Sequence, residues 1–181
     1  MRKFMWVIAL IVIAALPAQA QETPKVEIMG GYSFLRADMG GADLSMHGWR
    51  ASLTENVNSW LGGTADFSGF YAETSPGAGQ PDINVNAHTF LFGPQFSLRR
   101  NPSFTPFMHV LLGGIHASRG YLGISQPKTD FAAAFGGGFD VKVHNKLAIR
   151  VLQAEYIVTP FLNQRQDNIR LSAGIVLRFG K

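Results

Sequence analysis

The sequence predicts an all-β fold, namely an eight-stranded antiparallel up-and-down transmembrane β-barrel preceded by a cleavable signal peptide. Three observations support this prediction. The first residues read as an export signal, the rest of the chain alternates apolar and polar side chains with a period of two, and the alternating segments are joined by short and long connections in turn. A chain of 181 residues suits one such domain.

Residues 1–20 have the pattern of a secretory signal peptide. A basic start at Arg2 and Lys3 is followed by an apolar run and then by small residues before Gln21. The apolar run is short for a permanent transmembrane helix, which is the alternative interpretation. We therefore expect residues 21–181 to form the barrel domain after export.

Eight segments of the exported chain alternate apolar and polar residues, and no stretch shows helical spacing. Each of them reaches or approaches the ~9–11 residues that a tilted strand needs to cross a bilayer. Short connections at 55–59, 99–103 and 144–146 alternate with long ones at 37–46, 72–84, 118–130 and 159–167, which places both chain ends at the short-turn rim. The predicted strands are residues 25–36, 47–54, 60–71, 85–98, 104–117, 131–143, 147–158 and 168–179.

The two faces of these strands differ in chemistry. In residues 131–143, Phe131, Phe135 and Phe139 share one face, while glycine, alanine and two charged residues occupy the other. We expect the aromatic face to contact lipid and the other face to line a narrow interior. A soluble lipocalin-like barrel, with its apolar face inside, is the alternative. Tryptophan and tyrosine near the strand ends favour the membrane protein.

Two of the predicted strands depart from the simple alternation of an apolar and a polar face. In residues 147–158 the alternation changes phase, so Gln153 and Glu155 face the interior only if a β-bulge lies near Leu152. Residues 104–117 are apolar on both faces, and we expect His109 to point inside. Because an open sheet edge is costly in lipid, the last strand should pair with the first.

Charged and polar residues at the inward positions should form a salt-bridged plug, because an eight-stranded barrel has room inside only for side chains. A conducting pathway through these groups is the alternative. The residues expected in the interior are Glu27, Arg50, Asp66, Gln95, His109, Asp140, Lys142, Arg150, Glu155, Arg170 and Arg178.

The signal peptide, the eight-strand alternation and the segments GPQFSL, PFMHVLLGG and IVLRF resemble the small OmpA-like outer-membrane β-barrel family of Gram-negative bacteria. The resemblance implies export through the periplasm to the cell outer membrane, contact with its lipid and lipopolysaccharide, and insertion by the barrel assembly machinery. It also implies that Phe179 is the assembly signal, although Gly180 and Lys181 follow it. We expect no peptidoglycan-binding domain after Lys181.

Three functions are compatible with such a barrel. A structural or surface-binding role is expected, with four external loops that present a site for an unknown ligand. A small pore or diffusion channel is one alternative. The other is an enzyme, since the H-x-S spacing of His116 and Ser118 is similar to that of outer-membrane lipid A deacylases, and Asp130 could orient the histidine.

Composition excludes several other classes. The chain has no cysteine and therefore no disulfide, and its net charge of +4 includes two basic residues of the leader, so we expect no nucleic-acid partner. Its five histidines show no metal-ligand spacing along the sequence. We expect neither a metal ion nor a cofactor.

Overall fold

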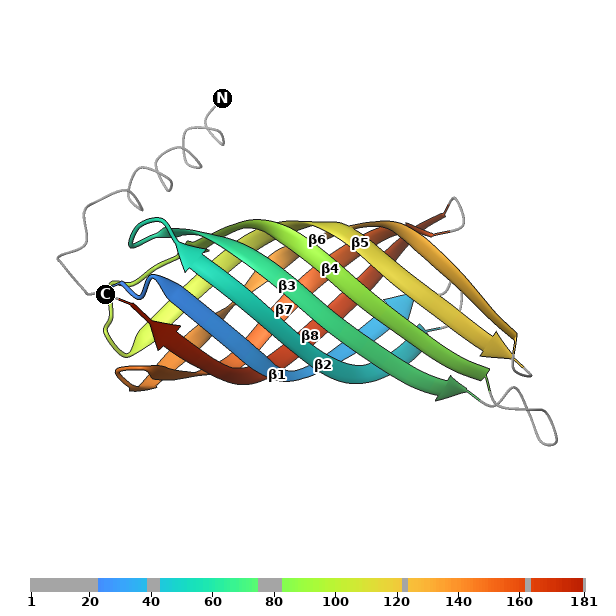
Figure 1. Ribbon diagram of the computed structural model, residues 1–181, viewed down its shortest axis with the longest axis horizontal. Helices are drawn as coiled ribbons and strands as arrows, with labels where there is room; N and C mark the ends of the chain where they lie inside the picture. Colours follow the sequence, from blue (N-terminus) through green and yellow to red (C-terminus); the bar gives the residue numbers. More distant parts are fainter. Residues whose placement is uncertain (1–22, 39–42, 75–82, 122–123, 162–163, 181) are drawn as a thin grey trace, which may run out of the picture.

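The computed structural model describes residues 23–38, 43–74, 83–121, 124–161 and 164–180, so the predicted signal peptide lies outside the described residues. The chain forms a closed barrel in which each strand pairs with its neighbours in the sequence (Figure 1). Within the described ranges there is no helix long and apolar enough to span a membrane. The strands are β1 (Val26–Asp38), β2 (Asp43–Asn56), β3 (Leu61–Thr74), β4 (Ile83–Ser97), β5 (Phe104–Tyr121), β6 (Ile124–His144), β7 (Leu147–Phe161) and β8 (Gln164–Phe179).

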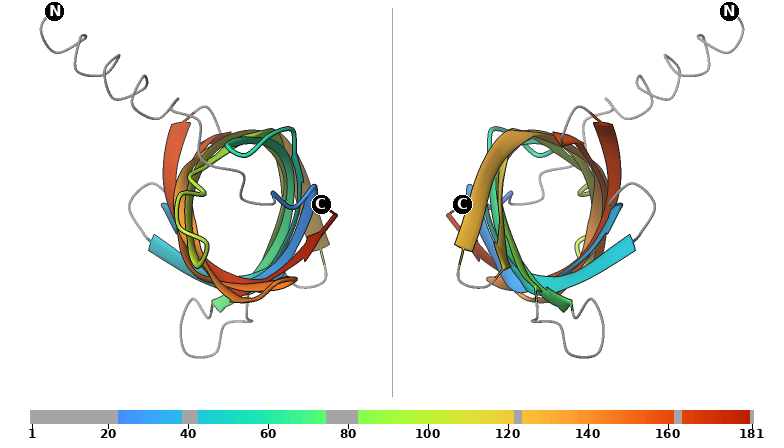
Figure 2. Two further views of the ribbon diagram at one scale, coloured as in Figure 1. Left: turned by 90° about the vertical axis from the view of Figure 1, so that its left-hand side faces the viewer. Right: turned by 90° about the vertical axis from the view of Figure 1, so that its right-hand side faces the viewer.

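The first and last strands close the ring, which confirms the predicted pairing. β1 runs antiparallel to β8, from Val26 opposite Phe179 to Arg36 opposite Ile169. Viewed along its axis, the barrel is a continuous ring (Figure 2). No backbone edge is therefore left unpaired around the wall, as a hydrocarbon environment requires. β1 begins and β8 ends at the rim that carries the three short turns (Figure 1).

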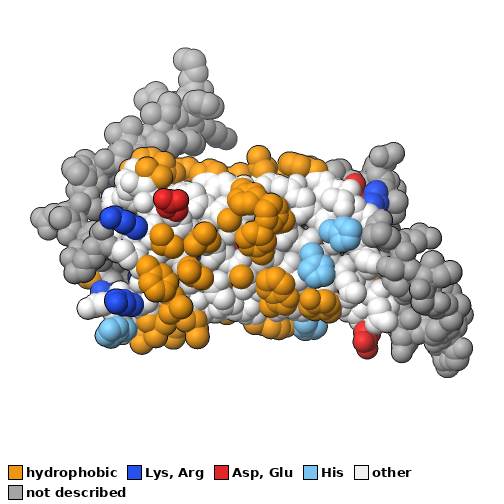
Figure 3. Space-filling view, viewed as in Figure 1, with side chains coloured by type: hydrophobic (Ala, Val, Ile, Leu, Met, Phe, Trp, Pro, Cys, Tyr) orange, Lys and Arg blue, Asp and Glu red, His pale blue; other side chains and the backbone are white. Residues whose placement is uncertain are grey.

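The predicted facing of the strands is confirmed. Phe135 is 59% exposed on the outer wall, whereas Arg170 is 0% exposed inside. Hydrophobic side chains cover much of the outer surface between the two rims (Figure 3). His109 points inward, as expected, while its neighbours Met108 and Val110 face outward. This arrangement is the reverse of a soluble barrel, in which the apolar residues would fill the inside.

The predicted β-bulge in β7 is also confirmed. Arg150 lies opposite Gly174 of β8 and Gln153 lies opposite Ser172, so one extra residue is accommodated between these pairs. Val151 and Leu152 are consecutive, yet both side chains are exposed on the outer wall. The extra residue therefore keeps the later polar side chains of β7 inside the barrel.

The long connections are shorter than the sequence suggested, and for two of them the expectation of an extended loop is wrong. Strands β5 and β6 stay paired up to Tyr121 opposite Ile124, and β7 and β8 up to Phe161 opposite Gln164. The physical reason is that ladder hydrogen bonds join backbone groups whatever the side chains are. Beyond the lipid, the apolar alternation that reveals a strand in the sequence is no longer required.

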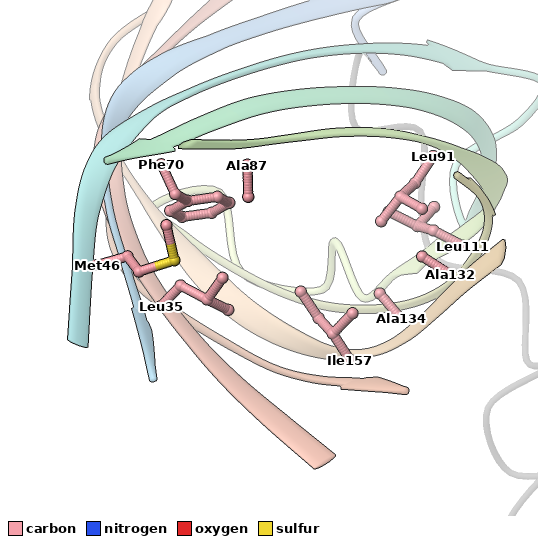
Figure 4. Packing of buried hydrophobic residues seen from close by; sticks show 9 residues of the cluster. All are labelled: Leu35, Met46, Phe70, Ala87, Leu91, Leu111, Ala132, Ala134 and Ile157. Atoms are coloured by element: carbon pink, nitrogen blue, oxygen red, sulfur yellow. The ribbon is translucent and has the colours of Figure 1, made fainter. Parts of the chain in front are cut away.

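The interior is not polar throughout, which corrects the expectation of a polar lumen. A hydrophobic cluster lines the loop-side part of the barrel, and its side chains project inward from the wall (Figure 4). Met46 precedes Arg50 along β2 and Phe70 follows Asp66 along β3, so in both strands the apolar residue lies nearer the loop end. The cluster consists of Leu35, Met46, Phe70, Ala87, Leu91, Leu111, Ala132, Ala134 and Ile157.

Candidate functional site

Four fully buried charged side chains meet in the middle of the barrel, and we call them the inner quartet: Arg50, Asp66, Glu155 and Arg170. Each comes from an inward position of the alternation, on β2, β3, β7 and β8 respectively. Arg50 Nε lies 2.6 Å from Asp66 Oδ2. Arg170 Nε lies 2.7 Å from Glu155 Oε2, and its Nη2 lies 3.0 Å from Asp66 Oδ1. Two cations and two anions make the inner quartet neutral.

Glu155 is the residue most fully bonded in the inner quartet. Its carboxylate accepts hydrogen bonds from both Arg50 and Arg170, and each guanidinium contacts it through two nitrogens. His109 Nε2 lies 2.7 Å from Glu155 Oε1. Paired two-point contacts between guanidinium and carboxylate are among the strongest hydrogen bonds in proteins, so this carboxylate holds β2, β5 and β8 to β7 across the interior.

Hydroxyl groups extend the inner quartet toward β3 and β4. Arg170 Nη1 donates to Ser68 Oγ at 2.8 Å, and Ser68 in turn hydrogen-bonds Thr89. All three side chains are buried. These contacts satisfy guanidinium hydrogens that the carboxylates do not reach, which is a condition for burying a charge at modest cost.

A second set of charges lies closer to the turn rim, and we call it the turn-end group: Glu27, Arg99, Asp140, Arg150 and Arg178. Glu27 lies between two arginines, with Arg99 Nη2 at 2.9 Å and Arg178 Nε at 2.8 Å. Arg150 donates two hydrogen bonds to Asp140, at 2.8 and 3.1 Å. Arg178 also lies 3.6 Å from Asp140, which joins the two pairs.

The two charged groups are linked by Gln153, the first inward residue after the bulge. Arg150 Nη1 donates to Gln153 Oε1 at 2.9 Å, and Gln153 Nε2 lies 3.5 Å from His109 Nε2. Through His109 the chain of contacts reaches Glu155. Polar contacts therefore run without a break from the turn rim to the middle of the barrel, and the groups are arranged to bind one another.

The structure brings together eight of the nine charged residues that the sequence places inside. The exception is Lys142, which is half-buried opposite Ala148. In the part of the chain that the structure describes, no carboxylate forms an ion pair with it. Gln95 is also inside, where its Oε1 lies 3.4 Å from Thr64 Oγ1.

Sequence reasoning missed Arg99, which it assigned to the short connection at residues 99–103. The side chain is buried, binds Glu27, and donates to Asn56 Oδ1 at 3.1 Å. The signal was available, since Gln95, Ser97 and Arg99 continue one inward alternation past the end of the apolar pattern. Side chains at the end of a strand still alternate between the inner and outer faces, even where the strand reaches water.

The three candidate catalytic residues do not all lie on one face of the sheet. His116 lies opposite Thr129, and its Nδ1 hydrogen-bonds Thr129 Oγ1 at 2.8 Å. Asp130 lies opposite Ile115, on the other face of the sheet, and forms an ion pair with Lys128 at 3.1 Å. Because neighbouring residues of a strand point to opposite faces, Asp130 is not positioned to orient the His116 ring. Ser118 is half-buried opposite Pro127.

Two other site predictions concern the wall. Phe179 is exposed on the outer wall at the turn rim as the last residue of β8, and Gly180 follows with a left-handed backbone (φ 73°).

The spacing of histidines along the chain does not indicate a pair, but the strand register places His88 directly opposite His116. No group of three or more metal-ligating side chains occurs within the described ranges.

A closed ring of strands with an apolar exterior and a charge-filled interior defines an integral membrane β-barrel. A family model for the outer membrane protein beta-barrel domain matches residues 6–179. The chain belongs to this family, and its location is the cell outer membrane. Among curated proteins, no sequence matches it.

Solved structures of small outer-membrane barrels share the fold. Neisserial surface protein A superposes with a TM-score of 0.68 at 14% identity, covering 88% of this chain and 100% of that one. Ail of Yersinia pestis, in complex with the heparin analogue sucrose octasulfate, gives 0.61 at 19% identity, covering 86% and 99%. OprG of Pseudomonas aeruginosa gives 0.54 at 13% identity, covering 91% and 100%. These identities establish similarity of fold alone.

Proposed function

We propose that this protein is a non-conducting outer-membrane barrel with a structural or surface-binding role. The observation that carries the proposal is the presence of two groups of buried ion pairs, the inner quartet and the turn-end group, which polar contacts through Gln153 and His109 link to each other. Five arginines and four carboxylates are engaged with one another inside the wall. A permeating ion would have to break contacts that are worth several kcal/mol when buried.

The hydrophobic cluster adds a second barrier. It lines the loop-side part of the interior, where side chains such as Phe70 and Leu111 are fully buried. Hydrophobic constrictions resist wetting, so ions and small polar solutes are disfavoured there. Both zones argue against the pore that the sequence left open as an alternative.

Planar-bilayer recording tests the sealed interior. The purified protein is expected to give no unitary currents under conditions in which a general porin conducts. Stepwise currents whose size changes in an Arg170→Gln variant would show that ions pass through this interior, and would contradict the proposal. The control is a detergent extract of cells that lack the protein, prepared in the same way. Currents that are also seen with this extract, and that do not change in the Arg170→Gln variant, belong to a contaminating porin.

The external end favours binding as part of the role. On the loop side of His116 and Thr129, the backbones of β5 and β6 stay paired, with Arg119 opposite Gln126 and Tyr121 opposite Ile124. A backbone that is already paired has less conformational freedom to lose, which lowers the entropy cost of binding a partner. The complex of Ail with a heparin analogue is one example of ligand binding on this fold.

A complementation experiment separates the structural and the binding roles. Cells that lack the protein are compared with cells carrying the parent chain or a chain shortened by deletion of residues 119–126. If the role is structural, the shortened barrel restores resistance of the envelope to detergent and large antibiotics. If the hairpin binds a partner, resistance stays low although the shortened barrel is folded in the membrane. Failure of even the parent chain to restore resistance would count against both roles.

A lipid A deacylase activity is tested by Ser118→Ala. Because His116 and Asp130 lie on opposite faces, we expect lipid A acylation in cells to be the same with the parent and the variant. Mass spectra of extracted lipid A give the measurement. Loss of 3-O-deacylation in the variant, with the parent still active, would support the deacylase hypothesis.

A further inference from the structure

The outer wall carries a hollow of about 390 Å³ that spans strands β2 to β6 near the loop end. This volume is within the range of ordinary small-ligand sites, about 300–1,000 Å³. Most of its lining residues are exposed on the lipid-facing side. The hollow is lined by Trp49, Phe67, Ser68, His88, Thr89, Phe90, Gly114, His116 and Thr129.

Two glycines shape this hollow. A Cβ at Gly114 would meet only the backbone oxygen of Asp130, at 3.5 Å, so the space over Gly114 is open. A Cβ at Gly69 would lie 2.7 Å from Trp49 Nε1 and 3.2 Å from a ring carbon of His88. Trp49 and His88 therefore lie close over the bare backbone of Gly69, and their rings form one side of the hollow. Phe90 and Phe67, in edge-to-face contact at 4.6 Å between ring centroids, provide an apolar side.

The loop-side edge of the hollow is polar. His88 and His116 are directly opposite on β4 and β5, and both are exposed. His116 Nδ1 is held by Thr129, and His88 Nε2 lies 3.5 Å from the hydroxyl of Tyr71. Histidine side chains gather toward the loop end of the hydrophobic surface in Figure 3. Among the lining residues that the structure describes there is no carboxylate.

The position of the hollow identifies its surroundings. In outer-membrane barrels the short turns face the periplasm and the opposite end faces the exterior, so this hollow lies in the outer leaflet. Water in an apolar hollow within the hydrocarbon would lack hydrogen-bond partners, whereas an acyl chain would fill it favourably. At the polar edge, imidazole groups can donate hydrogen bonds to an anionic oxygen.

We propose that this hollow is a binding site for the lipid A of lipopolysaccharide, with one acyl chain over Gly114 and a phosphate group on His88 and His116. The two parts of the ligand match the two parts of the site. The apolar floor binds the chain, and the pair of histidines, free of neighbouring carboxylates in the lining, binds the phosphate. A phospholipid could supply both parts, but the hollow lies in the outer leaflet, which in this membrane consists mainly of lipopolysaccharide.

Trp49 serves as a reporter inside the hollow. The chain has three tryptophans, Trp6, Trp49 and Trp60, so replacing Trp6 and Trp60 by phenylalanine leaves one reporter whether or not the leader is removed. This protein, folded in uncharged detergent micelles, is titrated with diphosphorylated lipid A while Trp49 emission is followed. We expect a saturable spectral change. Phosphatidylglycerol and lipid A stripped of both phosphates are the comparison lipids, and each should need a concentration at least about tenfold higher.

Substitutions test each half of the site. Gly114→Leu fills the hollow while its Cβ makes only an ordinary contact with the backbone oxygen of Asp130, at 3.5 Å, and we expect it to raise the half-saturating lipid A concentration at least about tenfold. The matched control is Gly63→Leu, since a Cβ at Gly63 meets nothing within 4 Å and this glycine lies on the outer wall away from the hollow. His88→Phe with His116→Phe should weaken lipid A to the level of the phosphate-free lipid. His144→Phe, at the turn rim, should leave binding unchanged.

Three outcomes would overturn the proposal. Equal binding of phosphatidylglycerol would show that the hollow takes any anionic lipid. Equal binding of phosphate-free lipid A would remove the role of the histidines. An unchanged titration in Gly114→Leu, with the folded barrel verified by its gel mobility before and after boiling, would show that the hollow is not the site. None of these results depends on whether the interior conducts ions.

Discussion

Replacing Glu155 by glutamine tests whether charge pairing in the inner quartet stabilises the barrel. The substitution keeps the shape of the side chain but removes the negative charge that Arg50 and Arg170 share. The two arginines would then have only Asp66 as a buried anionic partner, at 2.6 and 3.0 Å. The neutral quartet becomes a buried group with one excess positive charge.

The size of the effect follows from these contacts. Removing one partner of a buried ion pair costs about 3–5 kcal/mol, because the remaining charge is left uncompensated. Glu155 serves two arginines, but Asp66 stays in contact with both of them, so the penalty of a single broken pair applies. We expect Glu155→Gln to lower the free energy of unfolding by about 3–5 kcal/mol.

Equilibrium unfolding in guanidinium, with the protein in phospholipid vesicles and tryptophan emission as the probe, measures this change. The control is Glu55→Gln, an exposed carboxylate of β2, which should change stability by no more than about 0.5 kcal/mol. A second variant, Glu155→Gln with Arg50→Gln, restores neutrality and should recover part of the loss. A Glu155→Gln barrel that unfolds with the free energy of the parent would refute the reasoning.

Three further predictions follow from the wall and its ends. Arg99→Ala should cost about 2–3 kcal/mol in the same unfolding assay because it leaves a buried carboxylate with one cation fewer, whereas Arg100→Ala, at an exposed position, should cost less than about 0.5 kcal/mol. Deletion of Val151 removes the extra residue of the bulge and leaves Arg150 and Gln153 in regular alternation on the inner face, so the heat-modifiable gel band of a folded barrel should be kept; loss of the band would contradict this. Phe179→Ala should slow accumulation of that folded band in a pulse-chase of cells, while Phe104→Ala, an aromatic residue exposed at the same rim, should not; equal rates would rule out Phe179 as the assembly signal.

Most of the wall could be predicted from the sequence because lipid imposes one rule on every strand. A side chain that faces hydrocarbon must be apolar, so alternation reports both the strand and its facing, and a change of phase such as that near Leu152 reports a bulge. The same rule explains the failures. Above the lipid border neither face is constrained, and the paired hairpin that ends at Tyr121 and Ile124 looked like a loop.

The sequence predicts which residues lie in the interior better than it predicts which of them contact one another. Parity shows that Arg50, Asp66 and Glu155 point inward, but their meeting depends on how far neighbouring strands are staggered around the ring, and alternation carries no information on that stagger. Arg99 was missed since the apolar pattern stops before it. The hydrophobic cluster was missed for a related reason, because a buried Phe70 and a lipid-facing phenylalanine look alike when both faces of a strand end are apolar.

The bulge in β7 also determines how this chain can be compared with its relatives. On one side of Val151 the odd-numbered positions of the strand face the membrane, and on the other side the even-numbered positions do. A relative with a regular seventh strand would have to be aligned with a single-residue gap inside that strand, where gaps are ordinarily penalised most. An alignment that moved the gap into the nearest loop would match lipid-facing residues with interior ones along half the strand, and would hide Glu155 behind an apparent substitution.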